Sequence, residues 1–180
     1  MSRAQEKASS IKLLVLDVDG VLSDGRLHYG NSGEEIKAFY TPDGLGIKMA
    51  QKAGITVAII TGRKSAIVDR RARELGILHL VQGREDKLVA LQELTGKLKV
   101  DLAAVAYMGD DLPDLAAIQA AGLGMTVADG DAFVAEHADW RSQRRGGRGA
   151  VREACEFILQ AQDKLAAARA EFLQSGRDHV

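Results

Sequence analysis

The sequence predicts an α/β domain in which a doubly wound, Rossmann-like parallel sheet lies between two layers of helices. Short apolar segments alternate along the chain with segments whose apolar residues recur every three or four positions. The apolar segments, bounded by Gly or Asp, are residues 11–16, 55–60, 78–82 and 105–108, and the helical segments are 66–75, 86–98 and 112–122. Because parallel strands are connected by crossovers, usually helices, this alternation indicates three layers.

Length and charge limit the class of protein. The 180 residues suffice for one domain, 1–180, with one site. Because 24 Lys and Arg balance 25 Asp and Glu, no overall charge favours nucleic acid or a membrane surface as a partner. No segment approaches the run of about 18 apolar residues that spans a bilayer. The single cysteine, Cys155, lies in an apolar helical pattern, so we expect a buried, unreactive thiol and a cytoplasmic protein.

Three segments fall outside the regular alternation. Residues 25–40 are strand-like on either side of a Gly-Asn-Ser-Gly turn, which predicts a β-hairpin inserted after the first strand. The polar residues 1–10 are expected to form a flexible arm. Residues 160–180 are expected to continue the last helix as a tail, which must pack on its own domain or on a neighbouring subunit. The apolar stripe of that helix is Ile158, Ala161, Leu165, Ala168 and Phe172.

Polar side chains gather where the predicted strands end. Asp17 and Asp19 follow the first strand. Thr61 and Gly62 follow the second, and Asp110 follows the fourth. Taken singly, each pattern is typical of an ordinary turn or helix cap. Ligands of open parallel sheets bind beyond the carboxyl ends of the strands, so the shared placement predicts one site.

The acidic residues of this site predict a metal ion. Carboxylates held close together at neutral pH require a compensating cation. Asp17 and Asp110 are therefore candidate ligands of Mg²⁺, which takes carboxylate oxygens together with water and substrate phosphate. Lys87, which opens the helical segment 86–98, is placed to offset the charge of the phosphate oxygens.

The same residues predict phosphoryl transfer. With a metal to screen two anions from each other, Asp17 can attack phosphorus and form an aspartyl-phosphate. Asp19 can protonate the leaving oxygen and later deprotonate the water that clears the intermediate. Thr61 and the Gly62 amide, expected at a helix N-terminus, suit the transferring phosphate.

These segments resemble a known superfamily. "DVDGVLSDG" (17–25), "ITGRKS" (60–65), Lys87 and "MGDDLPD" (108–114) are similar, in order and spacing, to the four motifs of the haloacid dehalogenase superfamily. The second aspartate, Asp19, is typical of its phosphatases.

A longer resemblance, over roughly residues 11–160, is to the 3-deoxy-D-manno-octulosonate 8-phosphate phosphatases of lipopolysaccharide synthesis. It rests on the segments 24–55, 60–77 and 146–159. It implies a Mg²⁺-dependent homotetramer without a cap domain, in which the Asp19 backbone carbonyl is a further metal ligand. The sequence agrees about the cap, because only the hairpin separates Asp19 from Thr61.

The resemblance also implies substrate contacts. It places them on Tyr40, Thr41, Pro42, Asp43, Gly44, Lys48, Arg63, Arg71 and Lys87. The substrate carries a phosphate and a carboxylate, so several cations are chemically reasonable. Proline stands at position 42 where an arginine is expected, so one anion contact is either absent or supplied elsewhere. Lys48 replaces what can be arginine, and both Lys48 and Arg71 are equally compatible with ordinary exposed helix charges.

Without a cap, another segment is expected to cover the cleft. The candidates are the hairpin and the basic, glycine-rich residues 141–153, in which Arg144, Arg145 and Arg148 offer cations and the glycines allow close backbone approach. We expect Arg148 to contact substrate in a neighbouring subunit's site. The alternative for residues 141–153 is a solvated loop or a patch for an anionic polymer.

Other functions are compatible with parts of the pattern. A phosphatase for another sugar acid, such as N-acylneuraminate 9-phosphate, would share every motif. A phospho-receiver module would carry its acceptor aspartate before the threonine, whereas Asp110 follows Thr61 and Lys87. A non-catalytic scaffold is disfavoured because all four motifs are intact.

Overall fold

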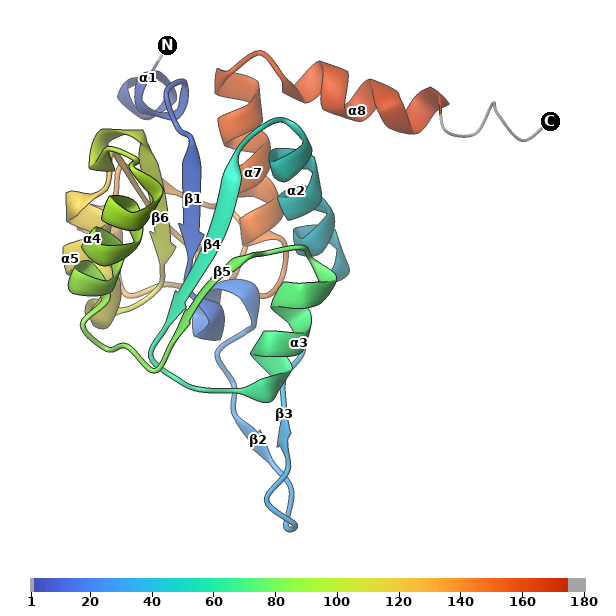
Figure 1. Cartoon of the computed structure of the whole chain (residues 1–180), viewed down its shortest axis with the longest axis vertical. Coiled ribbons are helices and arrows are strands. Elements are labelled where there is room, and N and C mark those ends of the chain that lie inside the picture. The colour runs from blue at the N-terminus through green and yellow to red at the C-terminus, as the bar shows by residue number, and fades with distance from the viewer. Residues whose placement is uncertain (1, 175–180) are drawn as a thin grey trace.

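The structure, a computed structural model, describes residues 2–174. Its centre is a six-stranded sheet in the order β5-β4-β1-β6-β7-β8, with every neighbouring pair parallel (Figure 1). The strands are β1 (Leu13–Leu16), β4 (Thr56–Thr61), β5 (His79–Gln82), β6 (Val105–Gly109), β7 (Leu123–Thr126) and β8 (Trp140–Arg141). The predicted doubly wound sheet is confirmed, and β7 and β8 extend it beyond the four strands expected.

Helices cover both faces of the sheet because side chains along a strand alternate in direction. In β1, the fully buried Leu14 and Leu16 join one core cluster, and Leu13 and Val15 join the other. The first cluster takes residues from α1 (Arg3–Ala8), α2 (Thr41–Lys52), α3 (Ala66–Glu74) and α7 (Ala150–Ala161). The second takes residues from α4 (Lys87–Leu98), α5 (Leu115–Ala120) and α6 (Ala132–His137).

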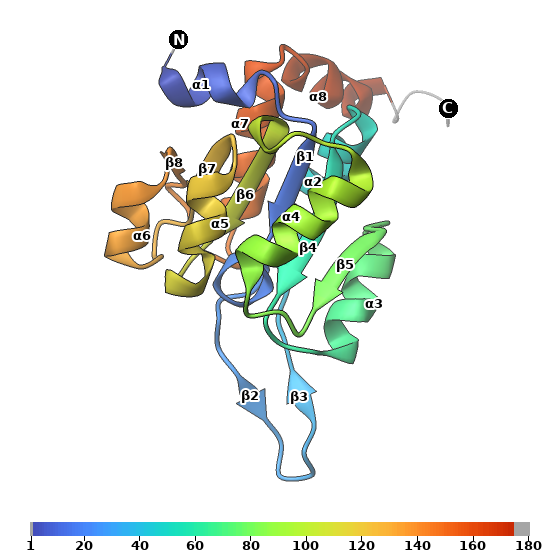
Figure 2. The same ribbon diagram turned by 60° about the vertical axis from the view of Figure 1, so that its left-hand side comes forward.

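The predicted hairpin is confirmed. Strands β2 (His28–Tyr29) and β3 (Glu35–Ile36) pair antiparallel, and Gly33 has a φ of 86° in the turn between them. The hairpin projects from the carboxyl end of the sheet, well clear of the body (Figures 1 and 2). Among the described residues only this hairpin and α2 lie between the first two parallel strands, so no cap domain is present there.

The N-terminal segment differs from the flexible arm expected at 1–10. Residues Arg3–Ala8 form α1, which begins with a capping box in which Ser2 and Gln5 exchange hydrogen bonds. Ala8 is fully buried in the first core cluster, and Lys7 Nζ lies 2.5 Å from a carboxylate oxygen of Asp139. The composition is polar, but capping and one buried face are enough to order this short helix.

The C-terminal tail does not continue α7 as expected. The helix ends at Ala161, the chain turns at Asp163, whose φ is 56°, and a separate helix, α8 (Leu165–Gln174), follows. The Gln162 side chain fixes the turn by donating hydrogen bonds to the carbonyls of Ala8 and Ile11. Leu165 and Ala168 pack on the core of their own domain, whereas Phe172 is 54% exposed. The part of the predicted tail at 175–180 lies outside the described residues.

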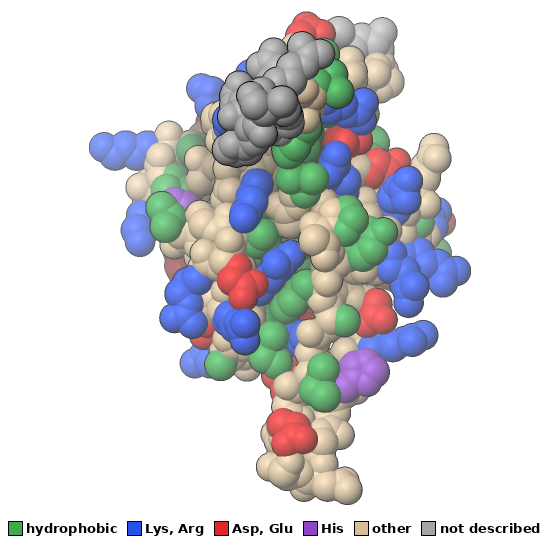
Figure 3. Space-filling model, turned by 90° about the vertical axis from the view of Figure 1, so that its right-hand side faces the viewer, with side chains coloured by type: hydrophobic (Ala, Val, Ile, Leu, Met, Phe, Trp, Pro, Cys, Tyr) green, Lys and Arg blue, Asp and Glu red, His purple; other side chains and the backbone are tan. Residues whose placement is uncertain are grey.

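The tail and the hairpin occupy opposite ends of the molecule. Helix α8 lies at the amino end of the sheet and the hairpin at its carboxyl end (Figure 1). On the face shown in Figure 3, cationic side chains are interspersed with apolar and acidic ones. Within residues 2–174, no helix is both long and apolar enough to cross a bilayer. Cys155 is completely buried in α7, and burial raises the pKa of its thiol to about 12, which leaves it unreactive.

Candidate active site

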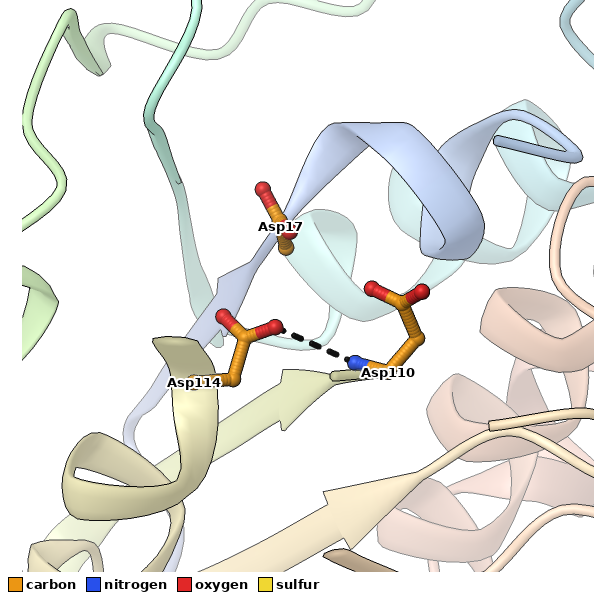
Figure 4. A group of neighbouring side chains, drawn as sticks. All are labelled: Asp17, Asp110 and Asp114. Carbon is orange, nitrogen blue, oxygen red and sulfur yellow. Dashed lines mark hydrogen bonds between the residues drawn. The ribbon is translucent and has the colours of Figure 1, made fainter. Parts of the chain in front are cut away.

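Three carboxylates meet where β1 and β6 end. The two strands are paired so that Leu16 lies opposite Met108, and the Asp17 amide donates to the Met108 carbonyl at 3.0 Å. Asp17 and Asp110 therefore follow adjacent strands, as expected. One carboxylate oxygen from each of Asp17, Asp110 and Asp114 lies within 4.8 Å of the others (Figure 4).

The turn after β1 sets the direction of its aspartates. Val18–Leu22 form one wide helical turn, in which Asp19 and Gly20 leave helical geometry. The Val18 amide donates to Asp17 Oδ1 at 2.7 Å. Gly20 has a φ of 89°, and a Cβ there would lie 2.0 Å from Asp110 Oδ2. Glycine is thus required both by the backbone conformation and by the approach of Asp110.

Lys87 joins two of the three carboxylates. Its Nζ donates to Asp17 Oδ2 at 2.7 Å and to Asp114 Oδ1 at 2.6 Å. All three side chains are less than 9% exposed. Burial opposes the ammonium charge, but the two carboxylates hold the pKa of Lys87 above its ordinary value. The buried charges are paired with one another, as stability demands.

Asp114 is a site residue that the sequence analysis did not single out. Besides Lys87, it accepts a hydrogen bond from the hydroxyl of Tyr107 at 2.9 Å and, through Oδ2, from the Asp110 amide at 3.2 Å (Figure 4). Asp114 is buried and lies four residues after Asp110, in the short helix Leu112–Asp114. The third acid of "MGDDLPD" is the signal that could have identified it.

The acidic cluster fits a divalent cation. Burial, together with the charge of Asp114, raises the pKa of Asp17 to about 6 and that of Asp110 to about 7. Across residues 2–174, no donor makes a hydrogen bond to the side-chain oxygens of Asp110, so these acceptors are available to a ligand. Oxygen-only donors in a partly buried, under-compensated cluster are the set that Mg²⁺ takes.

A cavity of about 530 Å³ lies beside this cluster. Its walls are Asp17, Asp19, Thr61, Gly62, Arg63, Glu85, Lys87 and Pro113. The structure therefore brings together the two proposed catalytic aspartates and all three proposed phosphate-binding residues. Glu85 and Pro113 were not predicted. Gly62 differs from expectation, because α3 begins after Ser65 and leaves the Gly62 amide in the preceding loop, outside the helix N-terminus.

Several proposed substrate contacts lie elsewhere. Tyr40 and Pro42 line a second cavity, of about 770 Å³, together with Arg144 and Arg152. Lys48 lines a groove between α2 and α8. Thr41 begins α2. These residues do not line the wall around Asp17.

Asp43, Gly44 and Arg71 make contacts that hold the fold. The buried Asp43 carboxylate accepts from the amides of Gly149 at 3.3 Å and Arg152 at 2.8 Å, so it caps the start of α7 from α2. A Cβ on Gly44 would lie 2.6 Å from Arg71 Nη2. The Arg71 guanidinium stacks over the Phe39 ring at 5.7 Å.

The glycine-rich loop packs on the turn that carries the aspartates. Gly147 donates to the Val21 carbonyl at 2.8 Å, and a Cβ on Gly146 would lie 1.7 Å from the Gly20 carbonyl oxygen. The close approach expected of these glycines is therefore made to the backbone after β1. Arg148, in the same loop, is exposed.

The chain is similar to proteins of one family. A family model described as haloacid dehalogenase-like hydrolase matches residues 73–151. The 3-deoxy-D-manno-octulosonate 8-phosphate phosphatase KdsC of Salmonella typhi is 50% identical over 165 residues, which cover 92% of this chain and 88% of the relative.

Solved structures agree with this match. A crystal structure of 3-deoxy-D-manno-octulosonate 8-phosphate phosphatase from Moraxella catarrhalis, in complex with a magnesium ion, a phosphate ion and a KDO molecule, superposes with a TM-score of 0.94. It is 52% identical and covers 96% of this chain and 99% of its own. The cobalt-bound phosphatase from Haemophilus influenzae has a TM-score of 0.87 and 44% identity, covering 89% of this chain and 94% of its own. With this identity and coverage, the chain belongs to the family of 3-deoxy-D-manno-octulosonate 8-phosphate phosphatases, within the haloacid dehalogenase-like hydrolases.

Proposed function

We propose that this chain is a Mg²⁺-dependent phosphomonoesterase that hydrolyses 3-deoxy-D-manno-octulosonate 8-phosphate to the free sugar acid and phosphate. The observation that carries the proposal is the buried Asp17–Lys87 pair beside Asp110, on the wall of one cavity at the carboxyl end of the sheet. Family membership supports the substrate, and lipopolysaccharide synthesis is the pathway that the resemblance implies.

The reaction proceeds in two displacements. A carboxylate oxygen of Asp17 attacks phosphorus while the bond to the sugar oxygen breaks, and Asp19 gives its proton to that oxygen. Asp19 then takes a proton from a water molecule that attacks the phosphorus of the aspartyl-phosphate. The bond to Asp17 breaks, its electron pair returns to the carboxylate, and phosphate is released.

Other residues of the cavity hold the phosphoryl group. Lys87 keeps one Asp17 oxygen fixed and offsets the charge that phosphate brings. The Thr61 hydroxyl and the Gly62 amide donate to phosphate oxygens, and Arg63 adds a cation at the rim. Asp17, Asp110 and the Asp19 backbone carbonyl hold Mg²⁺, which when bound screens the nucleophile from the phosphate anion.

The second cavity supports recognition of the sugar acid. Tyr40 lies on its wall, and Arg144 lies there beside Pro42, where an arginine was expected. We propose that Arg144 supplies that anion contact to the substrate carboxylate. Thr41, Asp43, Gly44, Lys48 and Arg71 remain proposed contacts, although Asp43 and Arg71 already have partners in the fold.

Phosphate release from a panel of esters tests the proposed substrate. With Mg²⁺, kcat/KM should be highest for 3-deoxy-D-manno-octulosonate 8-phosphate, lower for N-acylneuraminate 9-phosphate, and at least about 100-fold lower for hexose phosphates that lack a carboxylate. Asp17→Asn is the control and should release no phosphate from any ester. A preference for hexose phosphates would refute the substrate while leaving the phosphatase class standing.

We further propose a homotetramer. Leu27, Tyr29 and Ile36 on the hairpin are 42%, 63% and 59% exposed, which supports burial against other subunits. The described part of the tail lies at the far end of the sheet from the cleft (Figure 1), so a neighbouring subunit, through residues such as Arg148, would cover each site. A free cysteine supports the cytoplasm as the compartment.

A further inference from the structure

Lys37 is a buried cation that the reaction as proposed does not use. It follows β3 at the base of the hairpin, and its side chain is only 1% exposed. A buried ammonium is costly unless it is paired. Its partners are Asp19 Oδ1, with which it forms a close ion pair, and Glu35 Oε1 at 3.3 Å. The hairpin, which projects from the carboxyl end of the sheet (Figure 2), thus delivers a charge to the proposed acid and base.

The two oxygens of Asp19 have different surroundings. Oδ1 faces Lys37 and lies 3.5 Å from the Ser23 hydroxyl. Oδ2 has only Arg63 Nε near it, at 3.8 Å, which is beyond hydrogen-bond distance. Arg63 is in turn held by the hydroxyl of Tyr29 on the hairpin, at 2.9 Å. One oxygen is therefore anchored and the other is available in the cavity.

We infer that Lys37 is a positioning residue for Asp19: it holds the carboxylate through Oδ1, so that Oδ2 is the oxygen that exchanges protons with the leaving group and with water. The inference rests on the proposed phosphatase reaction. In the first displacement the proton on Oδ2 passes to the sugar oxygen as the bond from that oxygen to phosphorus breaks. In the second, Oδ2 takes a proton from the attacking water.

The arrangement favours proton transfer for two reasons. A carboxylate tied at one oxygen loses less orientational freedom when the reaction begins, which lowers the barrier. An ammonium already in place also stabilises the negative charge that develops on Asp19 as the proton departs. Both effects matter most when the leaving group is a poor one, such as a sugar alkoxide, and least for an activated aryl oxide.

Replacing Lys37 with methionine tests this role. Lys37→Met should lower kcat for 3-deoxy-D-manno-octulosonate 8-phosphate by about 10- to 100-fold and kcat for 4-nitrophenyl phosphate by less than about 3-fold, with KM nearly unchanged. Lys37→Arg should restore most of the loss. Arg26→Met, which removes an exposed cation at the base of the same hairpin, is the matched control and should change neither rate by more than about 2-fold.

A double-mutant cycle separates positioning from a structural effect. If Lys37 acts through Asp19, adding Lys37→Met to Asp19→Asn should change kcat by less than about 2-fold, because the group being positioned is already lost. Should Lys37→Met fail to fold, Lys37→Gln takes its place in every comparison.

Three results would overturn the inference while leaving the proposed function intact. They are equal losses on both esters, a full additional loss in the Asp19→Asn background, and a raised KM with unchanged kcat, which would make Lys37 a substrate contact. A wild-type protein that releases phosphate from neither ester would instead refute the proposed function, and the inference with it.

Discussion

Lys87 lies between two buried carboxylates, and each depends on it. Asp17 and Asp114 are 2.7 and 2.6 Å from its Nζ, and no cation other than Lys87 pairs with either of them within residues 2–174. Removing one partner of a buried ion pair leaves an uncompensated charge, which costs far more than the loss of an exposed pair.

Lys87→Met should therefore reduce both stability and activity. We expect the free energy of unfolding in urea to fall by about 3–5 kcal/mol at neutral pH without metal, and kcat to fall by at least about 100-fold. Lys97→Met, on the exposed face of the same helix, should change stability by less than about 0.5 kcal/mol. Similar small effects for the two variants would contradict the buried triad.

The raised pKa values of Asp17 and Asp110 predict how stability depends on pH. Both values, about 6 and about 7, lie above the ordinary 3.8. Between about pH 4 and pH 7 these groups bind more protons in the folded than in the unfolded state, so their contribution to the stability of the metal-free protein falls as pH rises. Mg²⁺ binds the ionised carboxylates.

Calorimetry at two pH values checks this prediction. Mg²⁺ should raise Tm more at about pH 7.5 than at about pH 5.5. Asp110→Asn should abolish most of that rise, whereas Glu136→Gln, a neutralisation on the exposed face of α6, should preserve it. A Mg²⁺ effect that is independent of pH, or one that survives in Asp110→Asn, would count against this cation site.

At this scale the sequence predicted the residues whose roles follow from strand ends. Asp17, Asp19, Thr61 and Lys87 line one cavity, because consecutive parallel strands end at one edge of a sheet. Asp114 and Lys37 were missed. Each is placed by a tertiary contact, to Lys87 and to Asp19, and no local pattern distinguishes them from ordinary surface charges.

Among the elements, the turn after β1 and the glycine-rich loop form one packed unit. The Gly147 amide donates to Val21, and Gly146 leaves no space for a side chain against Gly20. This contact supports the turn that carries Asp17 and Asp19, so the loop acts on the site through backbone packing.

Gly146→Ala should destabilise the protein and impair catalysis. The added methyl group would lie 1.7 Å from the Gly20 carbonyl oxygen, so one of the two segments must move, at a cost of about 1–3 kcal/mol in urea unfolding. Gly96→Ala in α4 is the matched control, because nothing lies within 4 Å of its Cβ position. It should be neutral or stabilising by up to about 1 kcal/mol. Comparable effects of the two substitutions would contradict the packed unit.

The elements missed by the sequence analysis share a cause. Strands β7 and β8 are short and lie at one side of the sheet, where apolar pattern is weak. Helix α1 is ordered by a cap and by burial of Ala8. The break between α7 and α8 is imposed by Gln162, whose side-chain partners lie about 150 residues earlier in the chain. Spacing along the chain cannot register such contacts.

On the scale of the whole molecule, the cleft lacks a cap and the hairpin exposes apolar side chains (Figure 3). If subunits pair through their hairpins, both features have one explanation, since assembly buries the hairpin and covers the cleft. The fold itself was predictable, because alternating strands and helices leave few topologies. Assembly was not, because exposed residues carry no periodicity that identifies their partner.

Light scattering tests the proposed tetramer. The wild-type protein should have the mass of four chains, and Ile36→Asp should dissociate it, because it places a charge on a hairpin side chain that is 59% exposed in one chain. Leu78→Asp, at a side chain that is 87% exposed next to β5, should leave the mass unchanged. A wild-type protein that is monomeric and fully active would rule out a cover supplied by neighbours.

The central claim is that Asp17 attacks phosphorus and carries the phosphoryl group. The stereochemical course of hydrolysis tests it most directly, using substrate with a chiral, isotopically labelled thiophosphate in labelled water. Each in-line displacement inverts phosphorus, so two displacements through Asp17 predict net retention of configuration. Net inversion would mean that water attacks the ester directly, and would contradict the assignment of Asp17 as the nucleophile.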